Sequence, residues 1–256
     1  MVSIIKHYFD CTDKQGQTII IYVATLKVLG MGIPFCSYLF NNGEVTREES
    51  RLQKVLINPS GKTRVSIPAL QVAGEWSASD KCISETLYSR AGKQITWNCF
   101  QPRSKVRVQI GSQVFEGLGY AETIKLPFHP SNLPIDLLLW GRYLSAGYTI
   151  IWIEWRGAYP LKKIYVNGIE QSDAKIEHDR ISFSSLGMAL HFKKVHPIKN
   201  NPLSALASRY PFLKWMFSRR FLSSQEIKYS GTGELVKGNQ IIDTGSTLYE
   251  TVHWKR

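Results

Sequence analysis

Residues 117–126 read GLGYAETIKL and place a carboxyl group within an apolar row of side chains. If this stretch is a β-strand, its side chains alternate between two faces, and Tyr120 and Glu122 share the apolar one. Burying a carboxylate costs free energy unless it has a partner or a chemical role. Burial would raise the pKa of Glu122, leaving a proton available for transfer to an alkene or enol. Glu122 is therefore a candidate general acid, and Tyr120 could orient a ligand oxygen.

The same pattern recurs near the end of the chain, where residues 245–254 read GSTLYETVHW. The matched pairs, 128 residues apart, are Gly117 and Gly245, Glu122 and Glu250, Thr123 and Thr251, and Ile124 and Val252. This offset of half the chain favours a duplication of two similar β halves. It also favours an alternative in which Glu122 is a structural anchor that pairs with Arg142 or another buried cation.

Aromatic residues supply the candidates for a ligand pocket. Trp97, Trp140 and Trp152 lie in apolar segments, and Glu154, a second candidate acid, shares a strand face with Trp152. His7 and Tyr8 belong to the opening strand, where His7 could approach the same cavity as His129. Such rings could line a concave, mostly apolar pocket, or they could simply form the core. The predicted ligand-binding residues are Trp97, Trp140, Arg142, Trp152, Glu154, Tyr8 and His7.

The chain carries 32 Lys and Arg against 20 Asp and Glu, a formal charge of +12 over 256 residues. This balance favours anionic partners, but the cations are spread along the chain, which argues against a specific nucleic-acid module. No GxSxG, HExxH or phosphate-binding loop is present, and Gly117-Leu-Gly is too short for a dinucleotide fingerprint. The four cysteines lack CxxC spacing, so we expect buried thiols, no metal site and no cofactor.

Short β-branched and aromatic segments between turn signals predict a mainly antiparallel β fold. Gln94–Cys99 and Lys105–Ile110 are two of these predicted strands, and Asn167-Gly168 is a predicted hairpin turn. Residues 201–224 differ, with apolar residues at helical spacing, and Pro211 predicts two short helices or one kinked helix. Their basic edge, including Lys214, Arg219 and Arg220, could meet an anionic membrane or simply cover the β domain. The absence of a signal-peptide pattern or a long apolar run predicts a cytoplasmic protein.

Several motifs together resemble the lipocalin-like carotenoid hydratase family, the hydroxyneurosporene synthase or AttH-type proteins. The opening HYFD at residues 7–10 is similar to the family's first strand, and GLGYAE at residues 117–122 matches its G-x-G-Y-x-D pattern. Residues 95–108, ITWNCFQPRSKVRV, resemble the strand that leads into it, and WGR at residues 140–142 matches a following motif. YETVHW at residues 249–254 is similar to the closing strand, so the matches stand in order along the chain.

The resemblance implies two lipocalin-like antiparallel β-barrel domains, residues 1–130 and residues 131–256, the second carrying the helical segment. Relatives of this kind include carotenoid hydratases and pericyclases of polyketide pathways. Here Glu122 replaces the family's aspartate, and Thr123, Ile124 and Lys125 occupy its His-Asn-Trp positions, which argues against carotenoid hydration.

Two functions remain open from the sequence. The first is a cofactor-free enzyme of the hydratase, cyclase or isomerase type that acts on a bulky apolar isoprenoid or polyketide-like molecule. The second is a non-catalytic carrier of an apolar ligand that docks to anionic membrane.

Overall fold

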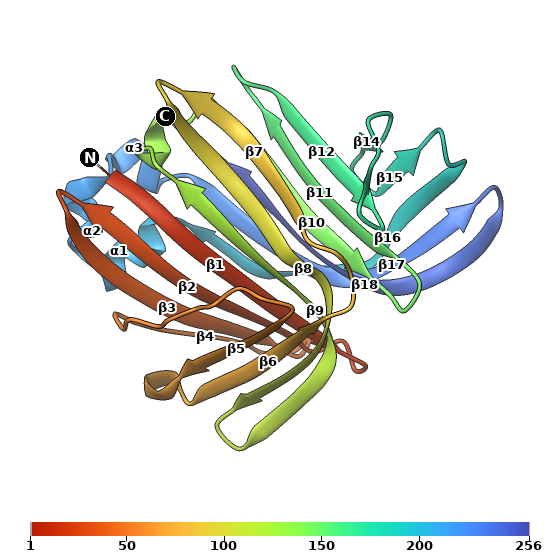
Figure 1. Ribbon diagram of the computed structural model, residues 1–256, viewed down its shortest axis with the longest axis horizontal. Helices are drawn as coiled ribbons and strands as arrows, with labels where there is room; N and C mark the ends of the chain where they lie inside the picture. The colour runs from red at the N-terminus through yellow and green to blue at the C-terminus, as the bar shows by residue number, and fades with distance from the viewer. Residues whose placement is uncertain (1, 256) are drawn as a thin grey trace. The chain divides into compact units, whose positions relative to one another are not determined.

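The computed structural model describes residues 2–255, and the chain divides into two compact units, residues 1–130 and 131–256. Each unit contains one curled antiparallel sheet of nine strands (Figure 1). The predicted mainly β fold, with two lipocalin-like antiparallel domains and a short helical segment near the C-terminus, is confirmed.

The sheet of the N-terminal unit has the strand order β4-β3-β2-β1-β9-β8-β6-β5, with β7 paired to β8. The first strand of the unit therefore lies beside the last one. The strands are β1 (Val2–Asp13), β2 (Thr18–Val28), β3 (Met31–Asn41), β4 (Thr46–Arg51), β5 (Lys62–Ile67), β6 (Val72–Ala78), β7 (Ile83–Arg90), β8 (Lys93–Ile110) and β9 (Gln113–Leu126).

Side-chain alternation along β1 and β9 divides the buried residues of this unit between two faces. Phe9 and Ala121 belong to the hydrophobic core on one face, where the Trp76 ring packs 5.0 Å from that of Phe9. Tyr8 and Glu122 belong to the opposite face, because each is the sequence neighbour of a core residue. A row of polar side chains is thus buried on the sheet face opposite the hydrophobic core.

The C-terminal unit repeats this arrangement, with the order β13-β12-β11-β10-β18-β17-β16-β15-β14. Its first strand again lies beside its last. The predicted Asn167-Gly168 turn joins β12 to β13, and both residues have the positive φ that such a turn requires, 48° and 80°. The strands are β10 (Leu137–Leu144), β11 (Thr149–Arg156), β12 (Leu161–Val166), β13 (Ile169–Glu170), β14 (Lys175–Ile176), β15 (Arg180–Phe183), β16 (Met188–Pro202), β17 (Gln225–Lys237) and β18 (Gln240–His253).

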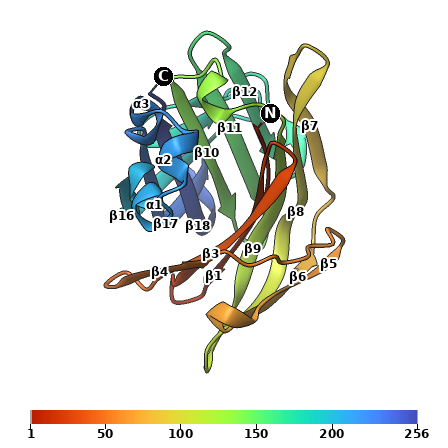
Figure 2. The ribbon, with the colours of Figure 1, turned by 90° about the vertical axis from the view of Figure 1, so that its left-hand side faces the viewer.

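The helical segment contains three short helices, where the sequence predicted two or one kinked helix. They are α1 (Ser204–Arg209), α2 (Leu213–Met216) and α3 (Arg219–Leu222), grouped between β16 and β17 (Figure 2). Pro211 falls between the first two helices. Ser218 starts α3, since its side chain accepts a hydrogen bond from the Phe221 backbone N–H at 3.1 Å.

Two further details of the predicted elements are corrected. Gln94–Cys99 and Lys105–Ile110 belong to one continuous strand, β8, whose pairing with β9 shifts register between Asn98 and Ser104. Cys11, Cys36 and Cys99 are buried as expected, whereas Cys82 is exposed. Across residues 2–255, the helices are all too short or too polar to cross a bilayer.

Candidate functional site

Glu122 lies in β9 between β1 and β8 and is 5% exposed. Its Oε2 accepts hydrogen bonds from the Trp97 indole N–H at 2.5 Å and from the Tyr120 hydroxyl at 2.6 Å. Both donors are buried, and they approach from different strands, β8 and β9. The carboxyl group is therefore fixed in orientation by two neighbours that the sequence singled out.

The electrostatics of this cluster keep Tyr120 protonated. Burial raises the pKa of the Tyr120 hydroxyl well above its usual range, and the nearby Cys99 and Glu122 raise it further. Burial likewise raises the pKa of the Cys99 thiol, so this side chain also stays neutral. Tyr120 is thus a permanent hydrogen-bond donor to Glu122.

Tyr8 belongs to the same cluster, whereas His7 does not. Tyr8 lies directly opposite Glu122 in the β1–β9 pairing, and its ring meets that of Tyr120 edge-on at 5.9 Å. By strand alternation His7 shares the face of Phe9, and its Nδ1 lies 2.8 Å from the Thr123 hydroxyl. Burial, followed by the charge of Lys125, lowers the pKa of His7.

The other predicted residues belong to the C-terminal unit and have separate surroundings. Arg142 is fully buried, and its guanidinium donates to the Ser246 hydroxyl at 2.9 Å. Glu154 accepts from Arg156 at 2.8 Å. Trp140 is buried and lies opposite Glu250 in the pairing of β10 with β18.

Glu250, the repeat partner of Glu122, forms an ion pair with Lys228. The Lys228 side chain is 3% exposed and also contacts Glu226 at 3.0 Å. Lys199 extends the chain of charges by contacting Glu226 at 3.3 Å. Glu250 is thus part of a charge network.

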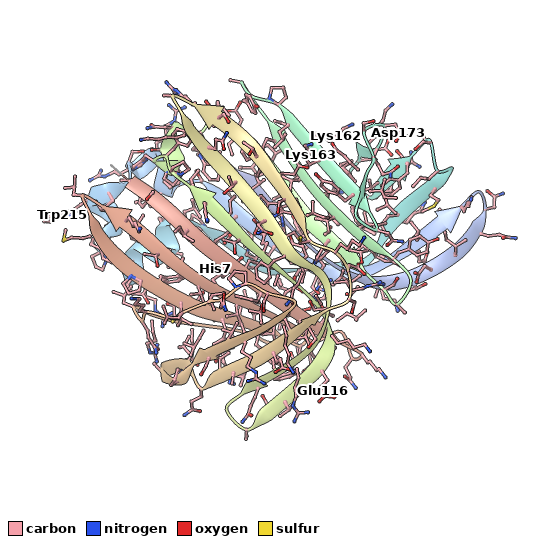
Figure 3. The ribbon with its side chains drawn as sticks, in the orientation of Figure 1. His7, Glu116, Lys162, Lys163, Asp173 and Trp215 are labelled. Atoms are coloured by element: carbon pink, nitrogen blue, oxygen red, sulfur yellow. The ribbon has the colours of Figure 1, made fainter. Side chains whose placement is uncertain are left out.

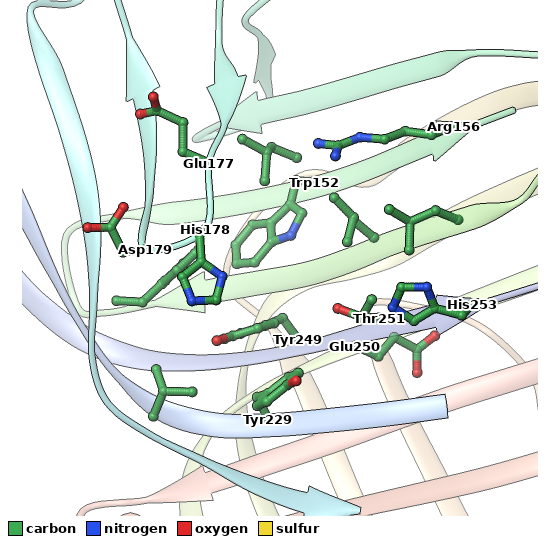
Figure 4. Close-up of a pocket in the computed structure, with 15 residues that line it drawn as sticks. Trp152, Arg156, Glu177, His178, Asp179, Tyr229, Tyr249, Glu250, Thr251 and His253 are labelled. Atoms are coloured by element: carbon green, nitrogen blue, oxygen red, sulfur yellow. The ribbon is translucent and has the colours of Figure 1, made fainter. Parts of the chain in front are cut away.

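Trp152 lines a cavity of about 680 Å³ in the C-terminal unit (Figure 4). Its floor contains a row of rings, in which Tyr249 stacks on Tyr229 at 4.9 Å and on Phe192 at 5.0 Å. Trp152 continues the row at 5.7 Å from Phe192. Aromatic faces arranged in this way suit a flat, apolar ligand.

Polar side chains stand around this aromatic floor. Arg156, His178, Asp179 and His253 line the cavity together with the rings. Burial and the neighbouring Tyr229 raise the pKa of Tyr249 to about 12, so its hydroxyl stays neutral. The cavity therefore combines neutral ring surfaces with groups that can hydrogen-bond a ligand's polar end.

Most of these lining residues were not among the sequence candidates. Tyr229, Tyr249, Phe192 and His178 come from β17, β18, β16 and the segment before β15, which only the folded sheet brings together. One local signal in the sequence could have indicated the cavity. Tyr249, Thr251 and His253 alternate along one strand, which places three cavity residues on the same face.

No family model and no curated protein matches the sequence. Solved structures match over nearly the whole chain. An AttH candidate from Nitrosomonas europaea has a TM-score of 0.58 at 9% identity, covering 99% of this chain and 92% of its own. Kievitone hydratase from Nectria haematococca has a TM-score of 0.56 at 8% identity, with coverage of 98% and 88%. CghA, in a structure with Sch210972, has a TM-score of 0.53 at 8% identity, with coverage of 99% and 88%.

These matches agree with the AttH-type resemblance carried by the sequence motifs. At 8–9% identity they establish the fold alone. The chain has the lipocalin-like fold that these three structures share.

Proposed function

We propose that this protein is a lipocalin-like enzyme of the hydratase, cyclase or isomerase type that acts on a bulky, apolar small molecule without a cofactor. The buried Glu122 carboxyl, held by Trp97 and Tyr120, carries this proposal. A fixed carboxyl group on a strand is suited to exchange a proton with an alkene, enol or leaving hydroxyl, because its geometry is set before the substrate binds.

In this mechanism the three residues have different roles. Glu122 transfers the proton. Tyr120 stays protonated and holds the carboxyl oxygen, and Trp97 holds the same oxygen from the neighbouring strand. Tyr8, facing Tyr120 edge-on, would offer a ring surface beside the reacting group.

Solvent isotopes provide a test that works for any substrate of this kind. The purified protein is incubated with a small-molecule extract of its native host in D₂O or in H₂¹⁸O, and products are detected by mass spectrometry. Protonation at carbon introduces deuterium, and hydration introduces ¹⁸O. We expect label uptake that Glu122→Gln reduces by about 10²-fold or more.

The matched control is Glu116→Gln, which changes an exposed acid of the same strand, β9. It should retain the labelling of the wild-type protein. If Glu122→Gln folds and labels normally, Glu122 does not transfer the proton and is a structural anchor.

A second candidate function is a carrier that holds an apolar ligand and meets an anionic membrane. The ring-lined cavity of the C-terminal unit favours it, because stacking surfaces bind flat molecules with or without chemistry. Extraction of protein purified from its native host, followed by mass spectrometry, should then yield an unaltered apolar molecule. Tyr249→Leu should reduce its recovery, while Tyr88→Leu, which removes a half-buried ring from the N-terminal unit, should not.

A further inference from the structure

The segment that contains α1, α2 and α3, residues 203–224, has an exposed basic surface. Arg209, Lys214, Arg219 and Arg220 are all exposed. Residues 200–225 include no Asp or Glu, so these cations have no carboxylate within their own segment. The neighbouring Lys199 and Lys228, by contrast, both pair with Glu226.

Trp215 follows Lys214 in α2 and is 95% exposed. Figure 3 shows its side chain pointing outward from the helical segment. Leu206, in α1 of the same segment, is 40% exposed. Tryptophan is normally largely buried, and an almost completely exposed one has an unfavourable contact with water.

The segment that presents Trp215 is anchored to its own unit. Leu213, beside Lys214, is buried, as are Ala207 and Phe221. The Phe221 ring meets Trp254 at 5.5 Å, and the Leu203 N–H donates to the Ser224 carbonyl at 2.9 Å across the ends of the segment. The exposed tryptophan is therefore not the end of a loose loop.

We propose that this segment docks the protein on an anionic lipid bilayer, with Trp215 inserted at the headgroup level. Lys214, Arg219 and Arg220 contact acidic headgroups. Tryptophan prefers the interface between water and hydrocarbon, and basic residues close to the surface are attracted by acidic lipids. The proposal specifies the membrane contact named for the carrier above, and it holds whether or not the protein also catalyses a reaction.

A membrane explains this surface better than a nucleic acid does. Proteins that bind single strands place several aromatic rings along a basic groove, one for each stacked base. Here one indole and the apolar Leu206 project from short helices. This combination is typical of an interfacial anchor.

Flotation of the full chain with vesicles provides the test. One set of vesicles is pure phosphatidylcholine, and the other contains about one third phosphatidylserine. We expect binding to the anionic set alone, weakened between 0.01 M and 1 M salt, where the screening length falls from ~30 Å to ~3 Å. Replacing Lys214, Arg219 and Arg220 by Gln should weaken binding by about a hundredfold at low salt, about fivefold for each charge. Trp215→Ala should weaken it about fivefold to tenfold.

Matched controls separate this site from general adsorption of a basic protein. Replacing Lys81, Arg90 and Lys105 by Gln removes three exposed charges from the N-terminal unit. Leu56→Ala removes an apolar side chain that is 82% exposed. Both should leave vesicle binding within about twofold, since neither changes the docking segment.

Three results would overturn the proposal. The first is no binding to anionic vesicles at 0.01 M salt, and the second is an equal loss in the two triple variants. The third is stronger binding to a single-stranded oligonucleotide that also depends on Trp215, which would assign the surface to nucleic acid.

Discussion

In the N-terminal unit Glu122 lies on β9, between the first strand β1 and the strand β8; in the C-terminal unit Glu250 lies on β18, between β10 and β17. Their matched glycines have the same role. A Cβ on Gly117 would lie 2.1 Å from the Thr12 carbonyl oxygen, and one on Gly245 would lie 2.3 Å from that of Leu144. The two halves therefore share the same close approach of the last strand to the first.

The two glutamates differ in the side chain that the penultimate strand of each unit places beside them. Lys228 of β17 lies directly opposite Glu250 in a regular pairing and forms the ion pair with it. In β8 the register shifts between Asn98 and Gln101, at the level of Glu122, and the Trp97 indole reaches the carboxyl instead. An ion pair to the glutamate is thus sufficient for the architecture of the C-terminal unit. In the N-terminal unit a neutral indole N–H takes this place at Glu122, the candidate acid.

The largest expected effect tests the shared architecture. Gly117→Ala and Gly245→Ala should each destabilise the protein by about 3 kcal/mol, because a methyl group must push two paired strands apart. Chemical denaturation followed by tryptophan fluorescence measures this. Gly61→Ala is the control, since nothing lies within 4 Å of its Cβ and its change should stay within about 0.5 kcal/mol. A small effect at only one of the two sites would show that the halves do not share this contact.

The next effect tests the charge network around Glu250. Lys228→Met should cost about 2–3 kcal/mol, because it leaves Glu250 and Glu226 without their shared cation. The cost stays below that of a fully buried pair, since these two side chains are 11% and 19% exposed. The free energy of unfolding should recover in the double variant Lys228→Met/Glu250→Gln. Without such recovery, the Lys228–Glu250 pair is not the source of the loss.

A smaller effect tests the neutral donors of Glu122. Trp97→Phe should destabilise the protein by about 1.5 kcal/mol beyond the loss of ring volume, since a hydrogen bond to a carboxyl group disappears. Trp155→Phe, at another buried tryptophan, measures the volume effect alone. In the isotope assay Trp97→Phe should lower the labelling rate while Trp155→Phe leaves it unchanged. Equal effects of the two variants would remove Trp97 from the site.

The fold class was predictable from the sequence, whereas the contacts within the cluster of Glu122, Tyr120 and Trp97 were not. Alternation with period two, and glycines at matched places, were local signals and were sufficient for the β architecture. The hydrogen bond from Trp97 to Glu122 depends on the register shift in β8. In the sequence, Pro102 and the polar residues around it made this part of β8 look like a gap between two strands. The ring row of the cavity joins residues from four strands, so no local pattern contained it.

The smallest expected effect is a difference between the two units in how stability depends on pH. His7 faces Thr123 in the N-terminal unit, and at the equivalent place of the C-terminal unit Leu139 faces Thr251. Burial lowers the pKa of folded His7 below 6.5, so the unfolded chain takes up the proton first as the pH falls. The stability that depends on neutral His7 is therefore present above pH 6.5 and is lost as the pH falls through the lower, folded pKa. His7→Leu, which copies the C-terminal unit, should flatten the decline of the free energy of unfolding between pH 7.5 and 5, whereas His253→Leu, at an exposed histidine, should not. If both variants keep the wild-type slope, His7 is not a source of the acid sensitivity, and the two halves respond alike to protons at this position.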